Sequence, residues 1–326
     1  MTFGLILKKL LKNPSAIAGL MLLFIFGFIA IFAPIIAPPP ENSTDNQIIP
    51  RDGLSRIPQP PSEEHKLGTT EGQYDIFYGV IWGTRTAFRI GIVIALFTTL
   101  IGLIIGSISA FLGGWVDEIL MRITDIFLAF PFLLTTIILT SVLQFVYERG
   151  EGGIMITTTR ILAFLTFGNN YFDPIKPTQL SFLYGMIAII MFGWMEIARV
   201  IRGNILVVKS SDYALAAKTI GAKNSRILFR HLVPNATFPL LVITPMNIGT
   251  YVLTYAALSF LGLGVQEGYA DWGQMLSVSR NWIFSLSDYP QIALYPGMAI
   301  VLFVLAWNLI GDALRDILDP RLKGTT

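Results

Sequence analysis

Six long apolar runs constrain the fold of this chain more than any other feature of its sequence. They cover residues 16–37, 90–112, 126–146, 180–198, 232–265 and 289–310. A helix crosses the hydrocarbon core of a bilayer with about 20 consecutive apolar residues, because lipid offers an unpaired backbone group no hydrogen-bond partner. The sequence therefore predicts an all-α membrane protein with six transmembrane helices.

The composition agrees with a membrane chain. Of the 326 residues, 53% are hydrophobic and 13% are charged, whereas about 25% of the residues are charged in an average soluble domain. The chain contains no cysteine, which excludes disulfides and thiolate metal sites. Only two histidines occur, His65 and His231, so a histidine-built metal centre within the chain is not expected.

The distribution of charge predicts the orientation of the six spans. Lys8, Lys9 and Lys12 precede the first run, and most of the 23 basic residues fall on the segments that are cytoplasmic if the amino terminus lies inside. Most of the 21 acidic residues fall on the opposite segments. By the positive-inside rule, both termini and the segment 210–234, between the fourth and fifth spans, are predicted to be cytoplasmic.

The first run resembles a signal peptide, but the residues at its carboxyl end argue against cleavage. Ala33 and Ala37 are each followed by proline, a poor context for signal cleavage, so we interpret the run as a retained anchor. We expect a cytoplasmic segment over 1–13, the first transmembrane helix over 14–37, an extracytoplasmic segment over 38–83, a five-helix core over 84–312 and a cytoplasmic tail over 313–326. Within the core, residues 147–179 form an outer insert, whose apolar stretch 154–168 is too short to cross and is expected at the membrane interface.

Prolines and small residues shape three of the spans. Pro131 breaks the third span, and Pro234, Pro239 and Pro245 predict a kinked entry helix ahead of the fifth. The second span carries a row of small residues that lets two helix backbones approach closely in lipid, which predicts a place inside the bundle. The row consists of Gly91, Ala95, Gly102, Gly106, Ala110 and Gly114. For any one of these residues, glycine merely tolerated in a membrane helix remains an alternative.

The segment 210–234 is polar, yet it carries a helical pattern. Ser211 and Asp212 can cap a helix whose first turn contains Tyr213. Gly221 can adopt a positive φ and so end this helix, after which a second short helix is expected over 225–232. The apolar positions that recur at helical spacing in the first helix are Ala216, Ala217 and Ile220.

This predicted helix-turn-helix is also basic. Its cationic residues are Lys218, Lys223, Arg226 and Arg230. Alanines on a helix surface allow the helix to enter a groove of another protein deeply, so the segment is a candidate docking element. The alternative is a basic loop that only fixes the orientation of the chain in the membrane.

The chain lacks the motifs of an enzyme that acts alone. The phosphate-binding spacing GxxxxGK[ST], a nucleophile elbow and an HExxH motif are all missing from the sequence. Asp125, Glu196 and Arg199 lie at inner ends of the predicted spans, where anchoring or mutual pairing is expected rather than a proton relay. The predicted spans place only neutral polar groups such as Asn247 and Asn308 at depth, which argues against an ion-driven secondary transporter. That transporter remains the alternative from another class, and a membrane enzyme is a more distant one.

A membrane transport chain with a cytoplasmic docking element but no nucleotide-hydrolysing motif is expected to be driven by a separate subunit. The segment 210–234 resembles the EAA coupling loop of ATP-binding-cassette importer permeases. The matching positions are Ala216, Ala217, Gly221, His231 and Pro234. The leading glutamate of the family pattern is Leu215 here, which puts any charge contact from this position in doubt.

Over nearly its whole length the chain resembles the second permease subunit of dipeptide, oligopeptide and nickel importers. The motifs that carry this resemblance include Leu67-Gly68-Thr69, Asp117-Glu118, Ala129-Phe130-Pro131, Ala198-Arg199, residues 256–264, Trp272-Gly273 and Pro296-Gly297. Two departures face outward. The aspartate and Gly-Arg pair of the family are Thr70 and Gln73-Tyr74 here, and the insert at 147–179 is longer than usual.

The resemblance implies a multi-pass inner-membrane permease that imports short peptides, with nickel or another solute as the alternative cargo. It implies a homologous second permease, two cytoplasmic ATP-binding subunits, an extracytoplasmic substrate-binding protein and no nucleic acid as partners. ATP and Mg²⁺ are then bound by the partner ATPases, and no cofactor by this chain. The coupling residues that it implies are Asp212, Tyr213, Ala216, Ala217, Gly221, Ile227, His231 and Pro234.

Overall fold

Capping side chains mark the beginning of the first two long helices. The computed structural model describes residues 8–41, 43, 45–53, 55–148 and 177–318. Asn13 caps α2 (Pro14–Ile36), because its side-chain oxygen accepts hydrogen bonds from N–H groups of the first turn. Asp75 does the same for α3 (Ile76–Leu112), with its carboxylate 2.7 Å from the N–H of Tyr78.

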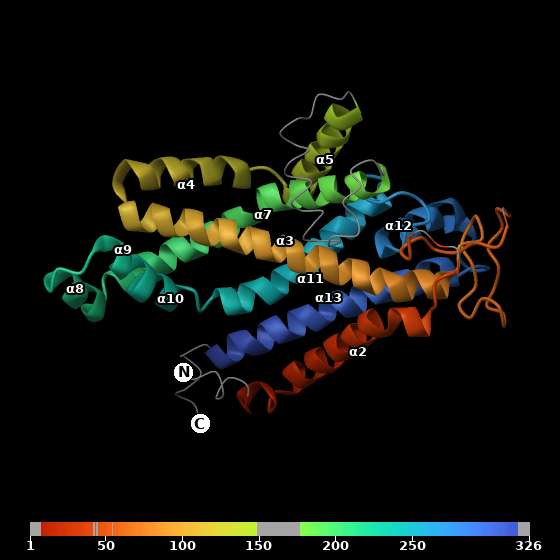
Figure 1. The fold of residues 1–326 in the computed structure, drawn as a ribbon, viewed down its shortest axis with the longest axis horizontal. Helices are drawn as coiled ribbons and strands as arrows, with labels where there is room; N and C mark the ends of the chain where they lie inside the picture. Colours follow the sequence, from red (N-terminus) through yellow and green to blue (C-terminus); the bar gives the residue numbers. More distant parts are fainter. Residues whose placement is uncertain (1–7, 42, 44, 54, 149–176, 319–326) are drawn as a thin grey trace.

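The helices run lengthwise through the molecule, and many of their connections lie toward its two ends (Figure 1). After α2 and α3 follow α4 (Gly114–Leu128), α5 (Phe132–Glu148), α7 (Pro177–Lys209), α8 (Asp212–Thr219), α9 (Asn224–Ile227), the π-helical turn η2 (Leu228–Leu232), α10 (Val233–Ala236), α11 (Leu240–Phe260), α12 (Trp272–Ser279), the 3₁₀ helix η3 (Arg280–Ser285) and α13 (Gln291–Leu318). Among the described residues no β-strand occurs. The prediction of an all-α chain is confirmed.

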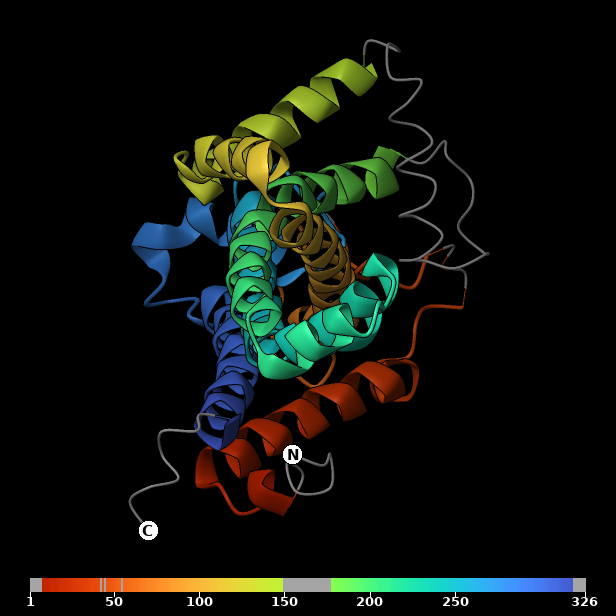
Figure 2. The same cartoon turned by 90° about the vertical axis from the view of Figure 1, so that its left-hand side faces the viewer.

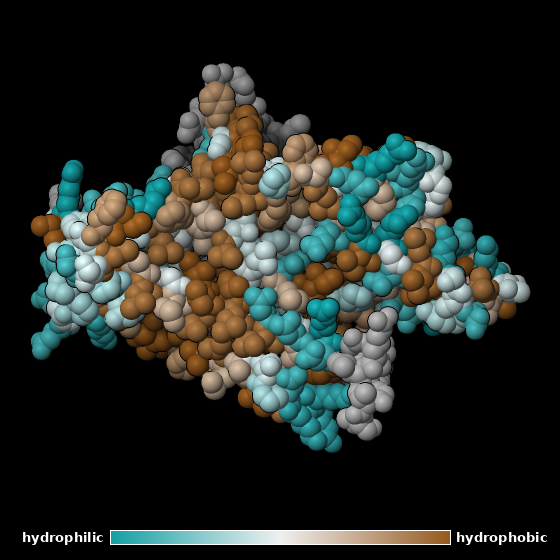
Figure 3. Space-filling view, turned by 180° about the vertical axis from the view of Figure 1, so that it is seen from behind, coloured by the Kyte–Doolittle hydropathy of each residue, from teal (hydrophilic) through white to brown (hydrophobic). Residues whose placement is uncertain are grey.

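Within the described ranges, five helices are long and apolar enough to cross a membrane, namely α2, α3, α7, α11 and α13. The helices α4 and α5 meet the same condition only together, which gives a sixth candidate if this bent pair is one span. In Figure 3, a broad apolar area covers the middle of the molecule, and hydrophilic residues gather toward both ends. The start of α2 and the end of α13 lie toward the end that carries α8 (Figure 1).

Several helices extend beyond the apolar runs that predict them. The helix α3 begins at Ile76, so residues 76–83, assigned by sequence to an extracytoplasmic segment, are already helical. The helix α7 continues past Ala198, the predicted end of the fourth span, to Lys209, and α13 continues past Ile310 to Leu318. An apolar run marks the part of a helix that suits lipid, whereas caps and turns decide where the helix ends.

The third span, expected over 126–146 with a break at Pro131, is formed by two helices. The helix α4 continues through Leu128, α5 begins at Phe132, and the pair is bent by 89°. Pro131 lies at this break, as the sequence predicts. Proline has no N–H and disfavours the helical conformation in the residue before it, so the chain turns there.

Two other predictions concern the neighbouring segments. The kinked entry to the fifth span is present, because α10 ends at Ala236 and α11 begins at Leu240, directly after Pro239. The outer insert expected over 147–179, with its interfacial stretch 154–168, lies almost entirely outside the described residues.

The helices α3 and α7 pack along the predicted row of small residues. A Cβ atom on Gly102 would lie 2.7 Å from a side chain of α7, and one on Gly106 would lie 2.4 Å from the carbonyl oxygen of Ala198. Ala110 continues the row and is fully buried. The interior position of α3 is therefore confirmed, although Gly114 begins α4 and has open space at its Cβ position. Figure 2 shows α4 and α5 on one side of the bundle and α2 on the opposite side.

A cap segment, residues 45–53 and 55–75, lies at the end of the bundle opposite α8 (Figure 1). The N–H of Ile49 donates to the carbonyl of Gly268, in the loop between α11 and α12, at 2.7 Å. The side-chain amide of Gln291 donates to the carbonyl of Gln59, and this hydrogen bond joins residues 232 positions apart. The cap segment therefore ties the beginning of the chain to its last third.

Candidate coupling site

The segment between α7 and α11 forms two helical pieces joined by a tight turn. The first piece is α8 (Asp212–Thr219), and the second is a continuous helical run of α9, η2 and α10 over residues 224–236. The sequence predicts this geometry but places the second helix over 225–232. The run extends beyond these bounds at both ends, from Asn224 to Ala236, and Pro234 lies within it, directly after the π-helical turn η2.

Gly221 ends α8 through its backbone conformation. Its φ is +80°, in the left-handed region that glycine enters at no steric cost. The N–H of Gly221 donates to the carbonyl of Lys218, and the N–H of Ala222 donates to the carbonyl of Ala217. These two bonds form a Schellman motif, which satisfies carbonyl groups that the end of a helix leaves free. The prediction that Gly221 ends the first helix with a positive φ is confirmed.

Ser211 occupies the capping position, but its hydroxyl does not cap α8. The residue is extended, with φ −75° and ψ 151°, as an N-cap residue requires. Its Oγ instead donates to the carbonyl of Val208 at 2.6 Å, back toward α7. The predicted side-chain cap is wrong, and Ser211 ties the two helices together at their junction.

One face of this helical unit packs against the bundle. The buried residues of the unit are Ala214, Ala217, Ile227, Leu228, Leu232 and Ala236. They form one apolar cluster with Ala110 of α3 and with Ile197, Ile201 and Ile205 of α7. The sequence places Ala216 and Ile220 on the same face as Ala217, but both are exposed. Ile220 is the C-cap residue, where the chain leaves the helix for the turn at Gly221.

The opposite face presents apolar and basic side chains together. The exposed fractions are 46% for Tyr213, 51% for Leu215, 85% for Ile220 and 70% for Phe229. Lys218, Lys223, Arg226 and Arg230 are exposed beside them, and none of the four forms a salt bridge within the described part of the chain. We call these eight residues the coupling surface. Adjacent exposed apolar side chains of this size are typical of a protein interface.

The residues singled out from the sequence divide between the two faces. Asp212, Tyr213, Ala216, Gly221 and Pro234 are exposed. Ala217 and Ile227 are buried within the chain, and His231 is half-buried. The structure therefore brings only part of the predicted set to the surface.

Polar side chains hold the end of α7 against α3 and α4. Arg202 forms a bidentate ion pair with Asp117, with both N–O distances 2.6 Å. Arg199 pairs with Asp125 between the same two helices. Lys209 Nζ donates to two carbonyl groups in the last turn of α3, at 3.1 and 3.0 Å. Bidentate pairing fixes orientation as well as distance, so α7 enters the helical unit from a defined position.

These contacts are only partly anticipated by the sequence. Pairing of Asp125 and Arg199 is among the expected roles, and it is present. The pair of Asp117 and Arg202 and the contacts of Lys209 are not predicted. The sequence does give one sign of the ion pair, because Asp117 and Arg202 carry opposite charges near the inner ends of two predicted spans. However, 85 residues separate them, so the sequence does not show that they meet.

Comparison with known proteins adds three findings. Residues 99–324 match the family described as binding-protein-dependent transport system inner membrane component. Residues 2–61 match the N-terminal TM domain of oligopeptide transport permease C. Helices α8 to α10 lie inside the first of these two matches.

Three relatives align with almost the whole chain. The oligopeptide transport system permease protein OppC of Bacillus subtilis is 36% identical, covering 96% of this chain and 87% of that protein. The dipeptide transport system permease protein DppC of Alkalihalophilus pseudofirmus is 34% identical, covering 97% and 89%. The glutathione transport system permease protein GsiD of Pectobacterium atrosepticum is 32% identical, covering 97% and 90%.

Proposed function

Because the chain belongs to the family of binding-protein-dependent transport system inner membrane components, we propose that it is one permease subunit of an ATP-driven importer of short peptides. The family and the apolar helices make it a multi-pass inner-membrane protein. The observation that carries the proposal is the similarity to permeases over 96% or more of the chain. The relatives are named for oligopeptides, a dipeptide and glutathione, which favours a peptide cargo over nickel.

The proposed assembly has four kinds of subunit. This chain pairs with a homologous second permease, and two cytoplasmic ATPases bind ATP and Mg²⁺ on the inner side. An extracytoplasmic binding protein delivers the peptide. The coupling surface docks on an ATPase, which would offer an apolar cleft with an acidic rim to Ile220, Phe229 and the four cations beside them.

The proposed mechanism transmits motion through a rigid unit. Closure of the ATPases on ATP displaces the coupling surface, and the buried face carries this displacement to α7 and α3. The Schellman motif at Gly221 resists bending within the unit, and the pair of Arg202 with Asp117 holds α7 against α4. A flexible connection would absorb the same displacement before it reached the helices that open the path.

The test uses the absence of cysteine from the chain. The variant Ile220→Cys places a single thiol on the coupling surface, and Phe284→Cys places a matched one on η3, where the side chain is 100% exposed. In the purified complex, a crosslinker with a maleimide at one end and a photoreactive group at the other should join Ile220→Cys to an ATPase subunit and leave Phe284→Cys unjoined to it. On intact spheroplasts, a membrane-impermeant maleimide should label Phe284→Cys only.

Two results would contradict the proposal. The first is labelling of Ile220→Cys from outside, which would place the coupling surface on the wrong side of the membrane. The second is a purified particle that transports peptide although Ile220→Cys contacts no other subunit. Uptake driven by an ion gradient in vesicles that contain this chain alone would favour a secondary transporter instead.

A further inference from the structure

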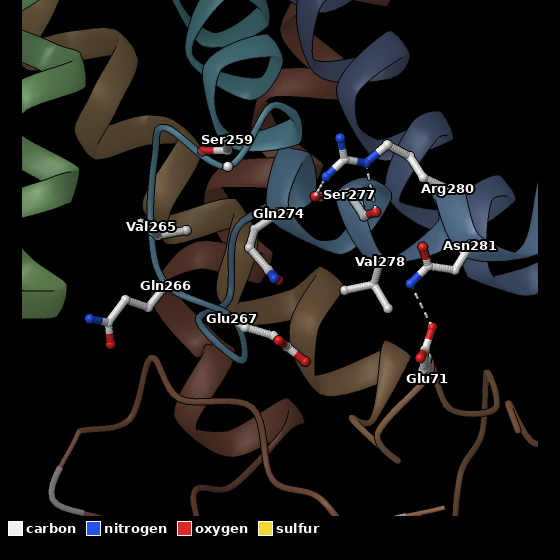
Figure 4. Close-up of a pocket in the computed structure, with 11 residues that line it drawn as sticks. Glu71, Ser259, Val265, Gln266, Glu267, Gln274, Ser277, Val278, Arg280 and Asn281 are labelled. Carbon is white, nitrogen blue, oxygen red and sulfur yellow. Dashed lines mark hydrogen bonds between the residues drawn. The ribbon is translucent and has the colours of Figure 1, made fainter. Parts of the chain in front are cut away.

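A polar pocket of about 380 Å³ lies between the cap segment, the loop after α11 and the end of α12 (Figure 4). Its volume falls in the range of about 300–1,000 Å³ that small-molecule sites occupy. We call it the cap pocket. The side chains that give it its chemistry are Glu71, Glu267, Gln274, Arg280 and Asn281. They come from three segments that are distant in the sequence, so the cap pocket exists only in the folded chain.

One end of the cap pocket is acidic. Glu71 Oε2 accepts hydrogen bonds from Asn281 Nδ2 at 2.9 Å and from Trp282 Nε1 at 3.1 Å, which hold the carboxylate in place. Glu267 is exposed, and its carboxylate forms neither an ion pair nor a hydrogen bond with the part of the chain that the structure describes. No cation of the described residues pairs with Glu71 either. Two carboxylates therefore face the cap pocket without a neutralising partner.

The other end of the cap pocket carries a single cation. Arg280 donates from Nε to the carbonyl of Ser277 at 3.1 Å and from Nη2 to Ser277 Oγ at 2.7 Å. Its guanidinium also lies over the ring of Phe260, 5.0 Å from the centroid. These contacts orient the group without cancelling its charge, because none of them involves a carboxylate. In Figure 4, Arg280 and the two glutamates lie at opposite ends of the group of side chains.

The amide of Gln274 lies between the two ends. Gln274 is 7% exposed and lines the cap pocket, and Figure 4 shows its side chain projecting between Arg280 and Glu267. Its backbone N–H is bound by Asp271, but within the described residues its side-chain amide has no hydrogen-bond partner. The amide atoms of Gln274 are not among the buried polar atoms that lack a partner in the described part of the chain, so they are open to the cap pocket and can bond a ligand there. An amide can both donate and accept, as the pairing of a peptide bond requires.

We propose that the cap pocket is a binding subsite for a short zwitterionic peptide, an inference that rests on the proposed function. The peptide ammonium donates to Glu71 and Glu267, its carboxylate accepts from Arg280, and its peptide bond pairs with Gln274. A simple anion fits less well because it would meet two carboxylates. A metal ion fits less well because no group of three or more suitable ligands occurs among the described residues.

The test measures direct binding to the complete complex of this chain with its partner subunits. The complex is held in lipid nanodiscs without the binding protein, which has its own peptide site. The probes are alanyl-alanine, its N-acetyl derivative and its C-terminal amide, titrated by ligand-observed NMR. Alanyl-alanine should bind roughly fivefold tighter than either blocked peptide, since each blocked peptide lacks one charge contact.

Charge-neutral variants separate the two ends of the subsite. Glu267→Gln should weaken alanyl-alanine roughly fivefold and leave the N-acetyl peptide unchanged. Arg280→Gln should weaken alanyl-alanine and leave the amide unchanged. Glu63→Gln removes an exposed glutamate of the cap segment outside the cap pocket and should change no affinity. Because Glu267 has no partner among the described residues, its variant is expected to fold normally, and thermal unfolding checks this.

Several outcomes would overturn the inference. One is that alanyl-alanine shows no saturable binding. Another is that the three peptides bind with equal affinity. A third is that Glu267→Gln lowers the affinity for all three peptides equally. A further one is a Glu267→Gln complex that binds alanyl-alanine normally but no longer binds added binding protein, since the cap pocket would then contact that protein. Peptide-stimulated ATPase activity, measured on the same complex after the binding protein is added, keeps the two proposals apart. If this activity is intact, only the subsite fails, whereas absence of any ATPase subunit contradicts the proposed function.

Discussion

Replacement of Gly221 is the perturbation that most directly tests the coupling site. Gly221 has φ +80°, and a Cβ atom at this position would meet no atom within 4 Å. The cost of a side chain is therefore conformational and not steric. For an ordinary L-residue, the left-handed conformation costs about 1–2 kcal/mol, while asparagine tolerates it better and a β-branched residue tolerates it worse.

The conformational cost of the turn should rise in a defined order across three variants of Gly221. Gly221→Asn should be nearly neutral, Gly221→Ala should destabilise the turn by about 1 kcal/mol, and Gly221→Val should destabilise it by about 2 kcal/mol or more. A cost of 2 kcal/mol lowers the population of the correct turn roughly 30-fold relative to its alternatives. Because the turn connects the coupling surface to the bundle, the number of peptides imported per ATP hydrolysed should fall in the same order.

The assay is uptake of a labelled peptide into proteoliposomes that contain the complete complex, with ATP hydrolysis measured in the same sample. Size-exclusion chromatography first establishes that each variant still binds the ATPases, since a strained turn could also prevent assembly. The matched control is Gly27→Ala on α2, where the Cβ position is equally open and the backbone is an ordinary helix. This control should leave the ratio of uptake to hydrolysis unchanged.

Two results would refute the reasoning. An assembled Gly221→Val complex with normal uptake per ATP would show that the turn does not transmit motion. A loss that follows side-chain volume, with asparagine worse than alanine, would show that the effect is steric contact with a partner and not backbone conformation.

The remaining predictions concern packing, pairing and protonation. Gly106→Ala should destabilise the protein by about 1–3 kcal/mol, because its Cβ would lie 2.4 Å from a backbone oxygen of α7; a melting temperature equal to wild type in detergent would contradict this. Arg202→Gln should cost about 1–3 kcal/mol by leaving Asp117 partly buried without its bidentate partner, and the double exchange of both charges should recover part of the loss in the same assay. Burial raises the pKa of Asp271, the cap of α12, from 3.8 to about 6. The folded state then holds this proton more tightly than the unfolded state, so stability falls as the pH rises from about 4 to 6, by up to about 3 kcal/mol. Asp271→Asn, which retains a capping oxygen for Gln274, should flatten this pH dependence of thermal unfolding, and an unchanged profile would contradict the assignment.

The spans and turns could be predicted because their causes are local. The length of an apolar run alone decides whether it can span the bilayer core, and Pro131 breaks a helix regardless of the residues packed around it. The turn at Gly221 follows from glycine and its helical neighbours alone. The start of α3 and the end of α7 could not be predicted in this way, since α3 begins at its cap Asp75, ahead of its apolar run, and α7 continues to Lys209 after its run has ended.

The parts that the sequence does not reveal depend on distant residues. Periodicity marks a small apolar face on α8, but it does not decide whether Ala214 or Ala216 faces the bundle. That choice depends on α7, which presents Ile197 and Ile201 to the unit. In the cap pocket, Glu71 meets Asn281 across 210 residues, and no short motif signals such a meeting.

The hydrogen bond from Gln291 to the carbonyl of Gln59 sets an order of events during synthesis. Gln59 leaves the ribosome 232 residues before its partner exists. At about 5–20 residues per second, the cap segment waits on the order of ten to fifty seconds for its bond to Gln291. Insertion of α2 and α3 into the membrane thus precedes completion of the cap segment's contacts. A nascent chain stalled before α13 lacks the hydrogen bond between Gln291 and the cap segment.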